Sequence, residues 1–111
     1  MLIGKGIVPG ACAFLDPVPH LLFSFAFTPR HDVQYFVASM CHPRTFDLLR
    51  GYNVVLWHAS QTGQYSIEHL LPPSTVEIGG GSSVAHRWIP MGCVLGFRDF
   101  DCHGFDASAR K

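Results

Sequence analysis

Alternating apolar and polar positions along the chain predict several short strands. Every second residue from Leu21 to Phe27 is apolar, which predicts a strand over residues 20–28. Residues 33–40 are rich in aromatic and β-branched side chains and are the expected pairing partner. The loop between them, residues 28–32, contains proline and aspartate, so the two strands are predicted to form a hairpin.

A second hairpin is predicted around the strongest core strand of the chain. Residues 52–59 form this strand, and a glycine-containing turn follows at residues 60–63. Residues 64–70 are expected to return as the antiparallel partner. Pro72 and Pro73 then end the pairing, because proline cannot donate a hydrogen bond to a sheet.

The pattern predicts one short helix in the middle of the chain. It covers residues 43–50, with Thr45 as the capping residue and Gly51 as the stop. The glycine-rich residues 79–83 are expected to form a flexible loop.

The remaining residues complete the predicted architecture. Two further short strands are expected at residues 84–89 and 92–98, and residues 101–111 open a second helix. The predicted fold class is therefore α+β. It is a β-rich single domain over residues 1–111, with a mostly antiparallel sheet of five to seven strands and one or two short helices.

Composition narrows the function classes. Of the 111 residues, 48% are hydrophobic and only 14% are charged, which excludes a disordered tail. Eight basic and eight acidic residues cancel, so nucleic acid is not expected as the main partner. The four cysteines are widely spread and form no C-x-x-C pair, which favours free thiols in a reducing, cytoplasmic compartment.

Cys102, His58 and His69 are the candidate catalytic residues. His58 and His69 lie on the two strands of the second predicted hairpin, which can bring their imidazoles together on one sheet face. Cys102 lies in the first turn of the last predicted helix, beside His103, where the helix dipole and an imidazole favour the thiolate. A thiolate beside an oriented histidine is a nucleophilic site in outline. The alternative is a small buried cysteine and two structural strand histidines.

Metal and cofactor sites are not expected. The Cys41–His42 and Cys102–His103 pairs could supply zinc ligands, but neighbouring residues in a strand point to opposite faces. The run of three glycines at residues 79–81 lacks the Gly-Lys-Ser/Thr of a phosphate-binding loop.

Two segments resemble the H-box/NC family. Trp57-His58, the glycine turn and the His-Leu-Leu-Pro-Pro run that starts at His69 are similar to its H-box, and Asp101-Cys102 is similar to its NC box. The family includes phospholipase A/acyltransferase proteins, lecithin:retinol acyltransferase and the 2A proteins of picornaviruses such as kobuviruses. The resemblance implies an NlpC-type cysteine peptidase fold, here with rearranged topology. It also implies that Cys102 is the nucleophile, His58 the general base and His69 the residue that orients it.

Departures from the family pattern favour a binding protein over an enzyme. Trp57 precedes His58, whereas the family has the reverse order, and Asp101 replaces an asparagine. The resemblance therefore implies a picornavirus 2A-like, non-catalytic protein that binds host proteins in the host cytoplasm. The alternative is a cysteine-dependent acyltransferase or phospholipase A, with a lipid or acyl donor as substrate. Low charge and many aromatic residues leave room for an oligomer.

Overall fold

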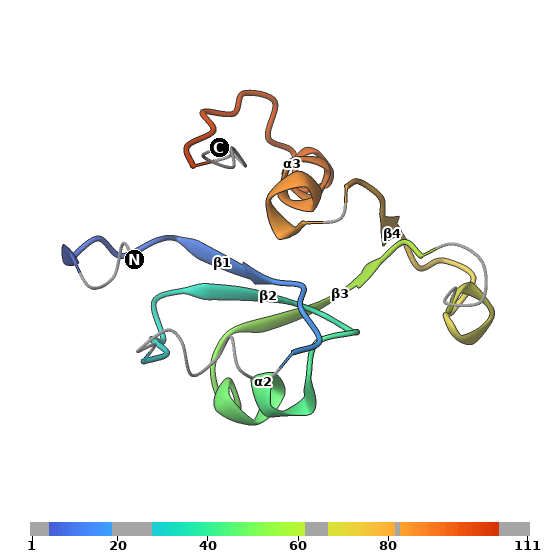
Figure 1. Ribbon diagram of the computed structural model, residues 1–111, viewed down its shortest axis with the longest axis horizontal. Coiled ribbons are helices and arrows are strands. Elements are labelled where there is room, and N and C mark those ends of the chain that lie inside the picture. Colours follow the sequence, from blue (N-terminus) through green and yellow to red (C-terminus); the bar gives the residue numbers. More distant parts are fainter. Residues whose placement is uncertain (1–4, 19–27, 62–66, 82, 105–111) are drawn as a thin grey trace, which may run out of the picture.

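The computed structural model describes residues 5–18, 28–61, 67–81 and 83–104. It has a four-stranded, all-parallel sheet in the order β1-β2-β3-β4, which curls into a half-barrel (Figure 1). The strands are β1 (Ala11–Phe14), β2 (Gln34–Ala38), β3 (Val54–Ala59) and β4 (Glu77–Ile78).

The expected mostly antiparallel sheet of five to seven strands is wrong. Helix α2 (Pro43–Leu48) connects β2 to β3, and such a crossover returns the chain to the same end of the sheet. The two strands therefore run parallel, with Phe36 opposite Val55. Four consecutive residues of β2, 35–38, are buried, which is typical of a parallel strand that is covered on both faces.

Neither predicted hairpin is formed by the described residues. Residues 19–27 lie outside the described part of the chain, and the outer neighbour of β2 is β1, which was not predicted. Residues 62–66 also lie outside it, and the 3-10 helix η3 (Glu68–Leu70) replaces the end of the expected return strand. The second partner of β3 is β4, again parallel, with His58 opposite Glu77.

The predicted central helix is confirmed as α2, but its cap is different. His42, not Thr45, is the N-cap: the Arg44 backbone N–H donates to His42 Nδ1 at 3.2 Å. Thr45 is buried instead. Gly51, the predicted stop, has a φ of 86°, which glycine adopts without strain.

Helix α3 (Val84–Val94) replaces the two strands predicted after the glycine loop. Ser83 caps it, because its hydroxyl accepts a hydrogen bond from the His86 backbone N–H. Val84, Trp88 and Met91 are spaced four and three residues apart and pack on the core. Pro90 lies inside this helix and interrupts its pattern in the sequence. No helix is formed at residues 101–104, and residues 105–111 lie outside the described part.

The core lies between the sheet and the two helices, which are on opposite sides of it (Figure 1). The largest fully buried side chains are Val33, Tyr35, Val37 and Leu49. On the α3 side, the Phe36 and Trp88 rings meet edge to face at 5.3 Å. None of the described helices is long and apolar enough to cross a membrane.

Candidate functional site

A row of polar side chains crosses three strands at the carboxyl end of the sheet. Ala38 is opposite Trp57, so the next residues, Ser39 and His58, are neighbours. Ser39 Oγ and His58 Nδ1 share a hydrogen bond of 2.9 Å. Glu77 is opposite His58 on the other side. Side chains in register point to the same face, so the parallel topology itself brings these residues together.

Two buried polar atoms near this row have no hydrogen-bond partner in the described part of the chain. They are Glu77 Oε1 and Trp57 Nε1. A buried polar atom without a partner costs about 1–3 kcal/mol, so such atoms are uncommon in folded proteins. Their presence at one end of the sheet distinguishes this end from the well-paired remainder of the core.

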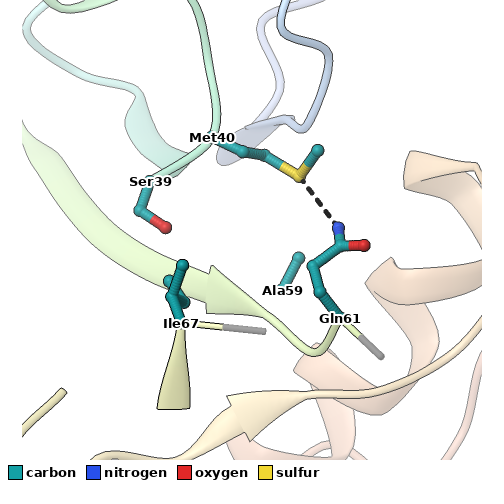
Figure 2. Close-up of a pocket in the computed structure, with 5 residues that line it drawn as sticks. All are labelled: Ser39, Met40, Ala59, Gln61 and Ile67. Carbon is teal, nitrogen blue, oxygen red and sulfur yellow. Dashed lines mark hydrogen bonds between the residues drawn. The ribbon is translucent and has the colours of Figure 1, made fainter. Parts of the chain in front are cut away.

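A pocket of about 340 Å³ opens beside Ser39, where β2 and β3 end (Figure 2). The described residues that line it are Ser39, Met40, Ala59, Gln61 and Ile67. The walls are mainly apolar. The Gln61 side chain donates to Met40 Sδ at 3.4 Å across the opening. Ligands of open parallel sheets bind at the carboxyl ends of the strands, and this pocket lies there.

The structure does not assemble the predicted catalytic triad. His58 lies on β3 with Ser39 as its partner, and His69 is exposed in η3. Cys102 is exposed in the segment after α3, which runs away from the end of β3 (Figure 1). Within the described residues, no hydrogen bond joins any two of the three. The triad depended on an antiparallel hairpin and a terminal helix, and neither is formed there.

The other described thiols and histidines do not form a metal-binding cluster. The described residues contain no group of three histidine, cysteine or acidic side chains that could hold a metal ion. Cys41 is buried, and desolvation raises the pKa of its thiol to about 11. Burial also raises the pKa of Cys12. Both thiols are therefore poor nucleophiles and poor ligands at neutral pH.

Arg87 joins α3 to this end of the sheet and was missed by sequence reasoning. Its guanidinium donates to the carbonyls of Gly81 at 3.0 Å, Ser60 at 3.1 Å and Ile78 at 2.9 Å. Gly80 lies against it: a Cβ there would come within 3.3 Å of Arg87 Cγ. The glycine-rich loop therefore allows a close approach to this side chain. The helical spacing of Val84, Trp88 and Met91 in the sequence was the signal that could have predicted a helix here and placed Arg87 on it.

Comparison of the chain with protein-family models, with curated proteins and with solved structures gives no match. The H-box/NC resemblance therefore stays a prediction. Any functional assignment has to come from the geometry described above.

Proposed function

We propose that the chain binds a partner protein through the side of β3 that faces away from β2, at the residues before β4 begins to pair. We also propose that it does not act as a cysteine-dependent acyltransferase. The observation behind this proposal is three consecutive exposed apolar residues on a central strand. Val54, Val55 and Leu56 expose 37%, 42% and 53% of their surface. Exposed apolar residues in an unbroken strand segment are uncommon away from interaction sites.

The backbone of this segment is open to pairing. On one side, β3 pairs with β2 from Val54 to Trp57. On the other side, β4 pairs only with His58 and Ala59, and no other described strand lies beside residues 54–57. Alternate residues of a strand direct their N–H and C=O groups to opposite sides, so Val54 and Leu56 present theirs outward. Such an edge is a template for an added strand.

The occupant that fits this edge is an extended segment of another protein. Val54 and Leu56 lie on one face of β3 and Val55 on the other, so apolar contacts are offered on both faces. A partner strand with β-branched residues would bury all three side chains and pair the open backbone groups. In the setting that the H-box/NC resemblance implies, this partner is a host protein.

The test uses a short peptide of alternating valine and threonine with a lysine at each end. We expect it to slow amide hydrogen exchange at Val54 and Leu56 in NMR spectra. The L56K variant should abolish the protection, because a lysine at an open edge opposes pairing. The matched control is L70K, which replaces a leucine outside the sheet that is even more exposed than Leu56.

Four outcomes would contradict the proposal. The first is no protection at Val54 and Leu56, and the second is equal loss of protection in L56K and L70K. The third concerns the alternative function: if the purified chain turns over a lipid ester and C102A abolishes that turnover, the chain is an enzyme. Sedimentation velocity without peptide shows whether a second copy of the chain occupies the edge instead, which would also refute a heterologous partner.

A further inference from the structure

We infer that the pocket at the carboxyl ends of β2 and β3 binds a small neutral heteroaromatic ring with adjacent hydrogen-bond donor and acceptor atoms, such as a purine. The pocket volume of about 340 Å³ is at the lower end of the range for small-molecule sites, so the ligand is small. None of the described residues that line the pocket is charged, so these residues offer no counter-ion to a phosphate or carboxylate group.

Gln61 provides the recognition group. Among the described residues, its amide N–H donates to the Met40 sulfur alone, at 3.4 Å. A thioether is a weak acceptor, so little is lost when a ligand replaces it. A carboxamide has a donor and an acceptor side by side, and it pairs with the adjacent donor and acceptor on the edge of an adenine ring. This side chain is therefore ready to form two hydrogen bonds with such an edge.

The walls fit a flat aromatic ring. Met40 and Ile67 lie on different sides of the pocket, and Ala59 lies between Ile67 and Gln61 (Figure 2). Methionine sulfur makes favourable contacts with aromatic rings. The Ser39 hydroxyl adds one polar contact, and its hydrogen bond to His58 fixes its position. This inference does not depend on the partner-binding edge, since residues 54–56 do not line the pocket.

The experiment is a titration of the full chain with 9-methyladenine, followed by NMR of ¹³C-labelled methyl groups. Met40, Ala59 and Ile67 each place a methyl-bearing side chain in the pocket, whereas Met91 is buried in the core and serves as an internal control. We expect saturable shifts at the three pocket methyls and none at Met91. Toluene, which has a ring but no polar edge, should bind at least tenfold more weakly.

Two variants distinguish hydrogen bonding by Gln61 from nonspecific binding in an apolar pocket. Q61A should weaken 9-methyladenine binding about tenfold, as expected for the loss of one to two neutral hydrogen bonds. Q34A is the matched control, because Gln34 is at the opposite end of β2 and donates to the Asn53 carbonyl. The inference is overturned if the pocket methyls do not shift, if toluene binds as well as 9-methyladenine, or if Q61A and Q34A bind alike.

Discussion

Replacing Arg87 by methionine should destabilise the fold more than any other single charged-residue substitution in the described part of the chain. Arg87 is only 9% exposed, and its three hydrogen bonds all go to backbone carbonyls. Neither ion pair among the described residues includes it. Methionine has a similar length and no charge, so the substitution removes the donors without leaving a buried charge behind.

The expected decrease in the free energy of unfolding follows from the hydrogen bonds that the three carbonyls lose. Ile78 O also accepts from the Ser60 backbone N–H at 3.0 Å and therefore stays paired. The Gly81 and Ser60 carbonyls lose the guanidinium as donor; both of these hydrogen bonds are part-buried, and a hydrogen bond to a charged group contributes about 1.5–3 kcal/mol. Relief of the desolvation cost of the cation offsets part of this loss. We therefore expect R87M to lower the free energy of unfolding by about 2–4 kcal/mol, a large share of a typical stability of about 5–15 kcal/mol.

The assay is urea unfolding followed by tryptophan fluorescence. Trp57 is buried in the core and Trp88 packs against Phe36, so both probes report on the sheet and α3. The control is R50M, which breaks an exposed pair with Asp47 at 2.8 Å and should change the stability by less than about 1 kcal/mol. If R87M were as stable as R50M, the three hydrogen bonds would contribute nothing measurable and the reasoning would be refuted.

Four further predictions test the core, the segment after α3 and the thiols. Y35F should lower stability by about 1 kcal/mol in the same assay, because the buried Tyr35 hydroxyl hydrogen-bonds to a backbone N–H and C=O. G92A should release the segment after α3, because a Cβ at this position would lie 2.5 Å from the Phe100 ring. In an F100A background the same change should instead stabilise α3 by about 1 kcal/mol. Equal effects of G92A in both backgrounds would exclude the contact between Gly92 and Phe100. Iodoacetamide at pH 8 should modify Cys41, with its pKa of about 11, roughly a hundredfold more slowly than exposed Cys93, as measured by peptide mass spectrometry. The raised pKa also predicts that stability falls between about pH 8.5 and 11, because only the unfolded chain loses that proton there.

The sequence located the two central strands and α2 because their signals are local. Residues 33–40 and 52–59 are apolar runs of strand length, and Gly51 marks the end of the helix between them. The direction of pairing could not be obtained in this way. The prediction already contained a strand–helix–strand unit, in which a helical crossover makes β2 and β3 parallel. Because a hairpin was expected on either side of this unit, the sheet was predicted to be antiparallel.

The candidate site was predicted only in part, for a related reason. His58 was correctly placed near the end of a strand, but its partner, Ser39, is 19 residues away in the sequence. No short motif connects residues that meet only through strand register. Arg87 was hidden because Pro90 interrupts the helical pattern of α3, so this segment was interpreted as strands.

The parallel topology also decides where function can be located in this chain. In an antiparallel hairpin, the carboxyl end of one strand lies beside the amino end of the next, so His58 and Ser39 would be separated by the length of a strand. In the observed sheet, the carboxyl ends of β2, β3 and β4 meet at one edge, where the Ser39–His58 pair, Glu77 and the pocket are found. The parallel direction of the strands thus explains why an unpredicted pocket lies beside His58, whereas the predicted triad depended on a second hairpin and a terminal helix that the described residues do not form. A search for ligands of this protein should therefore start at this edge and not at Cys102.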